Sequence, residues 1–372
     1  MNSTTHPSVV LKQKYTDIIR DSATRAEKDG RLTKTQLGLI YEQQWFKMLA
    51  PSSLGGLQTP LPETLRVAEA LAWADGGLGW QVAMAAGASW SAGFADAETV
   101  QKLLGDQKAC IAATTAASGT AEKTKGGYTI NGKWPQITGA QDATSFEVSC
   151  VLVKNGQPVK NDAGTEPQLL SFYLSKDEVS LTPAGNLVGL AAAEIQNLEV
   201  KHLEVAAARA FKVQNDAVKI DAPLYKFPYL QLMESLLAVN ISGMAVHFID
   251  LCDAVFAEQK NRSGVSLAND RTVQEILAKQ ILKLEDARTK LSYAIDISWQ
   301  SSVNFRQIKP AILYKISAAS YELSRRAIDC VDTLLPFCGV AGVDKATAIN
   351  KVWRDIHTAG QSELLVFGSL PE

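Results

Sequence analysis

The chain has 372 residues, of which 46% are hydrophobic and 20% are charged, and its 37 basic and 39 acidic side chains give a net charge of −2. A chain of this length can bury a large core in two or three domains, and its composition argues against intrinsic disorder. Non-specific binding of nucleic acid is not expected, because such binding requires a strongly basic surface.

Metal and disulfide chemistry are not predicted either. The four histidines are far apart and lack the short spacing of a helical zinc site. The five cysteines are an odd number and include no CxxC pair. Because no N-terminal signal peptide is recognised, we expect reduced thiols in a cytoplasmic protein.

Residues 1–105 are predicted to form a helical domain. Apolar side chains recur there at helical spacing, as in Leu37, Ile40, Tyr41 and Met48. Residues 51–56 have the Pro, Ser and Gly content of a loop, and Pro60 and Pro62 are typical of the start of the next helix.

Residues 76–95 of this domain carry no charge and are numerous enough to span a bilayer. The stretch is rich in Gly, Ala and Ser, contains Gln81 and has no flanking basic cluster, so membrane insertion is not expected. We predict one or two buried helices, with a break at the Gly-Gly-Leu-Gly of residues 76–79.

Residues 106–225 are predicted to form a small β-barrel or sandwich. Gly, Pro, Asn and Asp separate short apolar runs at residues 110–114, 128–131, 148–153, 169–174 and 195–200. The dipeptides at 126–127 (Gly-Gly) and 131–132 (Asn-Gly) are typical of hairpin turns.

Residues 226–372 are predicted to form an antiparallel four-helix bundle. Apolar residues three or four apart make four stripes, which run from Leu230 to Val255, from Val273 to Trp299, from Ile312 to Leu334 and from Ile349 to Gly360. The expected fold class is therefore α+β with several domains: N-terminal helices, a small β domain and a C-terminal four-helix bundle.

Three motifs occur in this order of zones, at residues 75–80, at 126–140, and at 337–342 followed by 352–357. They read Asp-Gly-Gly-Leu-Gly-Trp, Gly-Gly-Tyr-Thr-Ile-Asn-Gly-Lys-Trp-Pro-Gln-Ile-Thr-Gly-Ala, and Phe-Cys-Gly-Val-Ala-Gly with Val-Trp-Arg-Asp-Ile-His. Together they resemble the acyl-CoA dehydrogenase superfamily, and most closely its two-component flavin-dependent monooxygenase branch. The resemblance covers nearly the whole chain.

The resemblance implies a flavin, either FAD or reduced FAD or FMN, held between the β domain and the bundle of a homodimer or homotetramer. Thr138 matches the hydroxyl that bonds the N5 edge of the flavin, a role that suits a group able to donate and accept. Its alternative is a strand threonine facing a neighbour. The other residues that the resemblance assigns to the cofactor are Thr114, Thr115, Ser118, Trp134, Gln136, Ile137, Arg262, Phe337, Gly339 and Gly342.

Two of these assignments have a structural alternative. Trp134 matches a tryptophan of the monooxygenase branch but could equally be a core aromatic. Arg262 matches an arginine that reaches the flavin phosphate of a neighbouring subunit, and a planar bidentate donor suits that role. It could equally be a solvated charge at a helix end. Trp80, in the first motif, is expected to line the substrate pocket.

The residues leave the reaction open. A dehydrogenase needs a carboxylate base in the last helix, and Glu363 stands at the matching spacing, although the Gly-Thr that usually follows is absent and Glu363 could simply be solvated. The monooxygenase branch often has a histidine there, and the matching position is Ser362, which cannot replace a histidine in proton transfer near neutral pH. His357, five residues earlier, is not on the same helix face.

A third interpretation comes from Ala191, Ala192 and Ala193, where the family usually has small polar residues near the flavin. Their loss would suit a flavin-fold module that binds without catalysis. We expect a monooxygenase that uses reduced flavin from a separate reductase, with Thr138 in its active site. The first alternative is an acyl-CoA dehydrogenase with Glu363 as its base. We expect a small-molecule substrate, of a kind that the sequence does not identify, and no nucleic-acid, membrane or metal partner.

Overall fold

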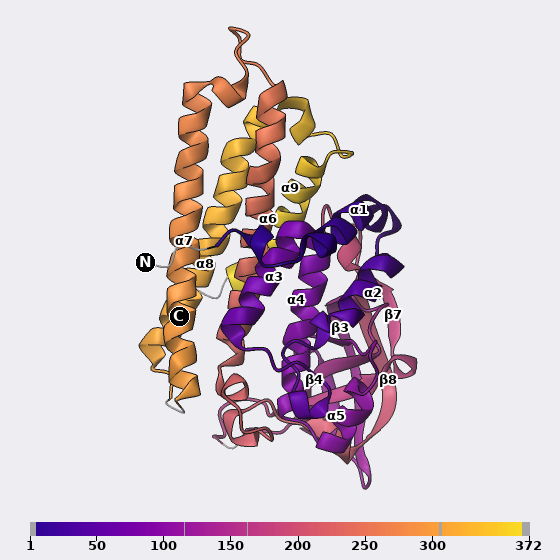
Figure 1. The fold of residues 1–372 in the computed structure, drawn as a ribbon. Helices are drawn as coiled ribbons and strands as arrows, with labels where there is room; N and C mark the ends of the chain where they lie inside the picture. The colour runs from indigo at the N-terminus through magenta and orange to yellow at the C-terminus, as the bar shows by residue number, and fades with distance from the viewer. Residues whose placement is uncertain (1–4, 115, 162, 305–306, 367–372) are drawn as a thin grey trace.

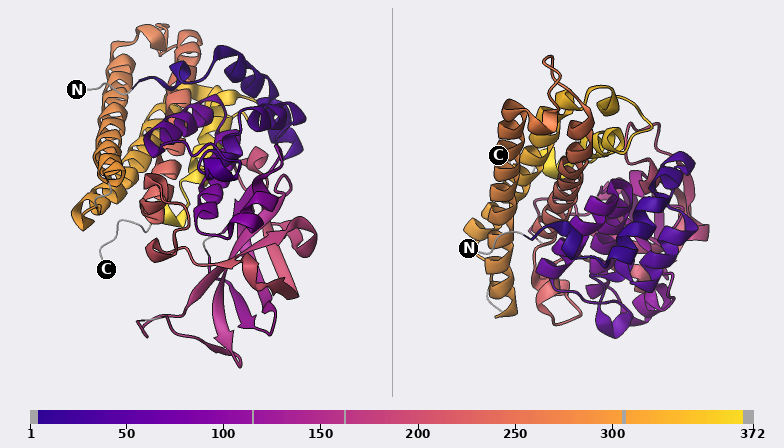
Figure 2. Two further views of the ribbon diagram at one scale, coloured as in Figure 1. Left: turned by 60° about the horizontal axis from the view of Figure 1, so that its bottom comes forward. Right: turned by 45° about the horizontal axis from the view of Figure 1, so that its top comes forward.

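The computed structural model describes residues 5–114, 116–161, 163–304 and 307–366. Figure 1 shows that N-terminal helices, a sheet and a group of long C-terminal helices follow one another along the chain. Figure 2 shows that the sheet extends from one end of the combined helices. The expected α+β architecture is therefore confirmed.

The N-terminal part contains five α-helices, one of which is almost entirely buried in the core. The helices are α1 (Gln13–Asp29), α2 (Lys34–Glu42), α3 (Leu61–Ala74), α4 (Gly76–Trp90) and α5 (Ala97–Leu104). The uncharged stretch forms α4 and the 3-10 turn η4 (Ser91–Gly93), and nearly every residue in it is buried. It is thus an interior helix, as its Gly and Ala content indicates.

The helix break lies one residue earlier than the glycines on which we placed it. Asp75 has extended backbone (φ −157°), and its side chain accepts a hydrogen bond from Leu78 N at 2.9 Å, which caps α4. Gly79 instead lies inside α4, where an added Cβ would stand 2.5 Å from Ala72 Cα. It therefore serves the close packing of α3 against α4 rather than a break.

The β domain is one nine-stranded sheet, with the strand order β7-β8-β3-β2-β4-β6-β9 and with β1 and β5 also paired to β4. Its strands are β1 (Ile111–Ala113), β2 (Gly119–Lys123), β3 (Gly127–Thr138), β4 (Ser145–Lys154), β5 (Gln157–Pro158), β6 (Leu169–Ser175), β7 (Ser180–Pro183), β8 (Ile195–Ala206) and β9 (Ala210–Phe211). The five predicted runs correspond to β1, β3, β4, β6 and β8. One face of the sheet encloses an apolar core of its own, and the other face packs against the helices.

The C-terminal part contains three long helices, α6 (Tyr229–Glu258), α7 (Arg271–Val303) and α8 (Pro310–Leu334), then α9 (Ala348–Ala359) and α10 (Glu363–Val366). The prediction of four long helices is wrong for the fourth, because α9 has only 12 residues and the chain turns at Gly360. The 3-10 segment η11 (Leu335–Gly342) joins α8 to α9, with a kink at Gly339 (φ 55°).

Helix α6 is the centre of the helical part, where it contacts α3, α4, α8 and α9. Among the described residues, α6 is the one helix long and apolar enough to cross a membrane, but 78% of its apolar window is buried inside the protein. That burial is the property of a core helix. Its backbone passes very close to α3 at Gly243, where an added Cβ would lie 2.2 Å from Glu69 O and 2.9 Å from Trp73 N.

The close approach at Gly243 gives a stability prediction. Gly243→Ala should lower the free energy of unfolding by about 2–3 kcal/mol, because the clashing atoms belong to the backbone of α3 and cannot move aside. Gly38→Ala in the exposed part of α2 is the matched control. It meets no atom within 4 Å and should stabilise the protein by roughly 0.5–1 kcal/mol. Urea unfolding measures both, and equal effects of the two substitutions would contradict the packing argument.

Candidate functional site

The end of β3 is fixed against the helices at Thr138 and Gly139. Thr138 is 7% exposed, and Gly139 has a left-handed φ of 68°. Gly139 N donates to Ala193 O at 3.0 Å and to Glu194 O at 2.8 Å. An added Cβ on Gly139 would stand 2.8 Å from Nε2 of Gln81 on α4. Thr138 therefore lies where the sheet, α4 and the segment before β8 meet.

We call residues 188–194 the site loop, and α9 holds its beginning. Leu190 N donates to Asp355 Oδ1 at 2.6 Å, and Gly189 N donates to Thr358 Oγ1 at 2.9 Å. Arg354 Nη1 donates to Val188 O at 3.2 Å. An added Cβ on Gly189 would lie 2.2 Å from Arg354 O, so only glycine allows this contact.

The site loop is also strained. Leu190 (φ 58°) and Glu194 (φ 48°) both have left-handed backbone, which costs a residue with a Cβ about 1–2 kcal/mol. Between them, Ala191–Ala193 form a 3-10 turn in which Ala192 packs close to Gly77 on α4. Strain that the surroundings hold in place is typical of functional sites.

Polar groups surround the turn after Thr138. Glu194 Oε2 accepts from Gln141 N at 2.7 Å, and Gln81 Nε2 donates to Asp142 Oδ2 at 3.1 Å. The other oxygen of Glu194, Oε1, and the amide oxygen of Gln81, Oε1, are buried and have no hydrogen-bond partner within the described part of the chain. Burial raises the pKa of Glu194, which favours its protonated form. Unpaired buried acceptors are costly, so this turn suits a ligand, a water or a proton that supplies a donor.

The other residues predicted for the sheet side of the site differ in burial and in position. Thr114 follows β1 and is half-buried, and its hydroxyl accepts from Ala116 N at 3.2 Å. Trp80 lies on α4, which contacts both β1 and β3, and is 7% exposed. Ser118 is exposed, and Thr115 lies outside the described residues.

The prediction that the Trp134 ring contacts a cofactor is wrong. The ring is completely buried in the apolar core of the sheet, and its Nε1 donates to Ser149 O at 3.0 Å. The alternative of a core aromatic is correct. The Ile137 side chain, 1% exposed, lies in the same core and is equally out of reach. Gln136 is exposed at a bulge of β3, with a φ of 58°.

The residues predicted for the bundle side lie at the ends of its helices. Arg262 is exposed in the connection between α6 and α7, which Figures 1 and 2 show at the end of the bundle away from the sheet. Phe337 is half-buried, Gly339 is exposed and Gly342 is buried in η11, which contacts α6. Arg262 is thus not assembled with Thr138 within one chain.

The last-helix residues do not form a buried catalytic centre. Glu363 begins α10 and is exposed, which favours the alternative of a solvated side chain. Ser362 is half-buried in the turn between α9 and α10. His357 turns toward α8, where its Nε2 lies 2.8 Å from Asp332 Oδ1, and its ring meets Trp353 edge to face.

The sequence analysis missed Glu147, a carboxyl group on the helix-facing side of β4. It is 8% exposed and lies next to the hydroxyls of Ser91 and Ser171; Ser91 Oγ is itself 2.7 Å from Tyr173 Oη. Burial raises the pKa of Glu147 to about 7, although the two serine hydroxyls act to lower it. A charged residue inside a run of buried strand residues was the available signal.

Glu147 gives a prediction about stability and pH. Its pKa is raised on folding, so its protonated form favours the folded state, and stability should fall as pH rises from the unfolded value of 4.5 through about 7. Glu147→Gln mimics the neutral form. It should leave stability nearly unchanged at pH 5 and raise it by about 3 kcal/mol at pH 8.5. Denaturant unfolding at both pH values tests this; a variant less stable than the wild type at pH 8.5 would show that the carboxylate is needed.

Known proteins resemble this chain in sequence and in fold. Residues 235–366 match the family described as acyl-CoA dehydrogenase, C-terminal domain. The chain is 23% identical to the flavin-dependent monooxygenase, oxygenase subunit HsaA of Rhodococcus jostii, over 91% of this chain and 89% of that protein. It is 25% identical to the protein of the same description from Mycobacterium tuberculosis, over 91% and 86%.

A solved structure agrees in fold. XiaF from Streptomyces sp., in complex with FADH2 and glycerol, superposes with a TM-score of 0.87 over 96% of this chain and 92% of that one, at 20% identity. The predicted resemblance to the acyl-CoA dehydrogenase superfamily is confirmed, and so is the prediction that the chain resembles the monooxygenase branch.

Proposed function

We propose that this chain, an acyl-CoA dehydrogenase-like and flavin-dependent oxidoreductase, is the oxygenase component of a two-component monooxygenase. The observation that carries the proposal is the similarity to oxygenase subunits over 91% of the chain. The exposure of Glu363 argues against the dehydrogenase alternative, because a base for carbon acids must work away from water.

The residues present fit a flavin. Thr114, half-buried, and Thr138, buried, offer hydroxyl groups at the ends of β1 and β3, and hydroxyls both donate and accept. Near Thr138, Glu194 Oε1 and Gln81 Oε1 have no donor within the described residues, which suits a group with N–H functions. A bound reduced flavin supplies the electrons for the reaction with oxygen. The chain's own part is to bind the ring, to hold a hydrogen bond with Thr138 and to exclude water through α4 and the site loop.

A separate flavin reductase is the partner that the description of the relatives as oxygenase subunits supports, and the substrate is a small organic molecule. The charged groups beside the turn after Thr138 include Glu194, Asp142 and Arg31, whose Nη2 lies 3.4 Å from Asp142 Oδ1. Hydrogen-bonded positioning is the task that we propose for this site. We propose a cytoplasmic location because all five cysteines are free and buried.

Flavin titration tests the proposed function. The wild-type protein should bind reduced FAD or FMN, and Thr138→Val should weaken that binding about tenfold, since one charge-assisted or neutral hydrogen bond contributes roughly 1–1.5 kcal/mol. Thr182→Val on the exposed edge strand β7 is the control and should bind as the wild type does. Anaerobic titration followed by flavin absorbance measures both affinities.

The outcomes separate the alternatives. Purification as a yellow protein that retains oxidised FAD and dehydrogenates acyl-CoA thioesters would favour the dehydrogenase. No binding of oxidised or reduced flavin by the wild type would overturn both enzymatic functions and leave the non-catalytic module. An equal loss of flavin affinity in Thr138→Val and Thr182→Val would show that Thr138 is not part of the flavin site.

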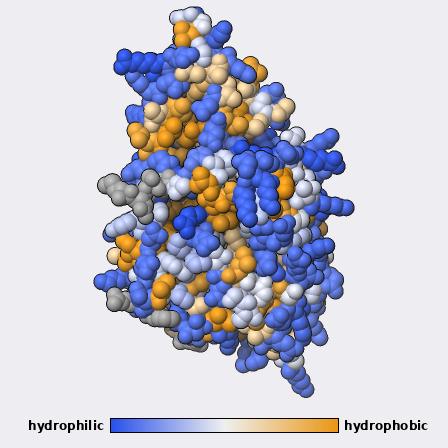
Figure 3. Space-filling view, viewed as in Figure 1, coloured by the Kyte–Doolittle hydropathy of each residue, from blue (hydrophilic) through white to orange (hydrophobic). Residues whose placement is uncertain are grey.

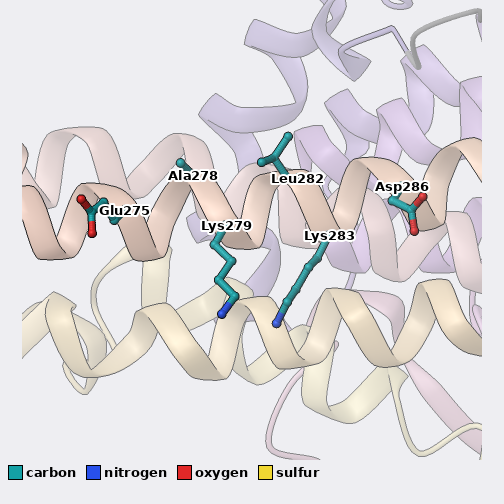
Figure 4. Close-up of a pocket in the computed structure, with 6 residues that line it drawn as sticks. All are labelled: Glu275, Ala278, Lys279, Leu282, Lys283 and Asp286. Carbon is teal, nitrogen blue, oxygen red and sulfur yellow. The ribbon is translucent and has the colours of Figure 1, made fainter.

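We further propose that two copies associate through α7. Its outer face carries Leu282, 71% exposed, and Tyr293, 68% exposed. Figure 4 shows Leu282 between charged residues along this helix, and Figure 3 shows apolar residues gathered over the upper part of the bundle. A two-fold axis between residues 282 and 283 would pair antiparallel α7 helices with Lys279 opposite Asp286. This charge pattern is complementary to itself, as a two-fold interface requires.

Leu282→Lys should therefore disrupt the association, because it places a like charge opposite Lys283 across the axis of the interface. The mass measured by light scattering should fall by half or more. Leu57→Lys, at another exposed leucine (42%) in the loop before α3, should leave the mass unchanged. A wild-type protein that is monomeric at high concentration would contradict the proposal.

A further inference from the structure

Lys351 is a buried cation between two buried carboxylates. Its Nζ lies 2.8 Å from Asp75 Oδ2 and 2.6 Å from Asp355 Oδ2. The side chain of Lys351 is 11% exposed, and those of Asp75 and Asp355 are 2% and 3% exposed. Burial acts to lower the pKa of Lys351, but the two carboxylates outweigh it and the pKa is raised. The ammonium group therefore stays charged over the whole working range of pH.

Each carboxylate uses its other oxygen to hold a backbone N–H. Asp75 Oδ1 accepts from Leu78 N at 2.9 Å and so caps α4. Asp355 Oδ1 accepts from Leu190 N at 2.6 Å and so holds the site loop. Lys351 thus links the start of α4 to the site loop through two short hydrogen-bonded paths.

The contact with Leu190 occurs where the site loop needs support. Leu190 has the left-handed backbone that a branched residue avoids, and Gly189 before it touches the backbone of α9. The other end of the loop, at Ala193 and Glu194, accepts the N–H of Gly139, next to Thr138. A shift of Leu190 would therefore affect the end of β3, because Glu194, which holds Gly139, is only four positions after Leu190.

Removal of the cation would leave two carboxylates facing each other without a counter-charge. Asp75 already acts to raise the pKa of Asp355, as burial does, and Lys351 is the group that opposes both effects. Without it, one carboxylate must take up a proton or move away. Asp355 would then lose the fixed, fully charged oxygen that Leu190 N uses.

We propose that Lys351 is a positioning residue of the flavin site, which acts through Asp355 to fix the site loop and, with it, the orientation of Thr138. This inference rests on the proposed function for the identity of the ligand, and its structural part is tested separately. Lys351 of α9 would thus have a functional role, although the histidine that the monooxygenase branch often has at the position of Ser362 is missing.

The test uses hydrogen exchange of the Gly189 and Leu190 amides, anaerobic titration with reduced FMN and thermal unfolding. Lys351→Met should lower the protection of the Leu190 amide at least tenfold and weaken FMN binding about tenfold. Asp75→Asn, which retains the pair of Lys351 with Asp355, should keep Leu190 protection within threefold of the wild type.

Two further variants separate positioning from general destabilisation. The double variant Asp75→Asn with Lys351→Met has the same net buried charge as the wild type, so it keeps the test valid if Lys351→Met alone fails to fold. It should still lose Leu190 protection, because Asp355 is then a buried carboxylate without the cation that holds it charged and in place. Arg288→Met removes another buried cation, 3% exposed and paired with Glu69 and Glu285. Within the described residues, Arg288 donates to Glu69, Glu285 and Thr5 O, none of which belongs to the site loop. Arg288→Met should lower the thermal midpoint but leave FMN affinity within twofold.

Unchanged Leu190 protection in the double variant would overturn the inference. So would an equal loss of FMN affinity in the Arg288 and Lys351 variants, because that result indicates loss of global stability only. Failure of the wild type to bind any flavin would instead refute the proposed function, while amide exchange would still report whether Lys351 holds the site loop.

Discussion

The close approach of α3, α4 and α6 is the constraint on which the rest of the structure depends. Glycines at the crossings, such as Gly79 and Gly243, leave no room for a Cβ, so three backbones share one narrow interior. Because the helices are so close together, the position of α4 along its own axis and its rotation about that axis are fixed. The side chains of α4 then meet the sheet at β1 and at the end of β3, beside Gly139. The junction that carries Thr138 is a consequence of this packing.

The buried charged side chains also depend on close packing, because their partners must lie within hydrogen-bond distance. Arg288 and Lys351 are buried only because each faces two carboxylates, and each links helices that are distant in sequence. Glu147 differs, because its hydrogen-bond partners are hydroxyl groups rather than a cation, and burial raises its pKa. The paired charges hold helices together, whereas the unpaired carboxyl group makes the contact between sheet and helices sensitive to pH.

Much of the fold could be predicted because apolar spacing and turn residues act locally. The stripes of α6, α7 and α8 and the strand runs repeat with the period of their element. The extent of α9 follows the fourth stripe, from Ile349 to Gly360, and only the expectation of a fourth long helix is wrong, because that stripe is short. The break at Asp75 was missed by one residue because a capping side chain, rather than the glycines, sets it.

The site was less predictable than the fold, since it is built from contacts between distant segments. Motif similarity singled out Thr138, which lies at the junction of sheet and helices, but it could not tell on which face of the sheet Trp134 lies. The roles of Leu190 and Lys351 carry no local sequence signal. Leu190 depends on Asp355, 165 positions away, and Lys351 depends on Asp75, 276 positions away, and no periodicity reports such distances.

The hydrogen bond between Leu190 and Asp355 joins residues that are 165 positions apart. During synthesis on a ribosome, the sheet and most of the helices are available long before α9 has been translated. The strained backbone of Leu190 has no carboxylate to hold it in that period. The completed protein is therefore the first species with a finished binding site, and a prematurely terminated chain would have its core without the means to capture a cofactor.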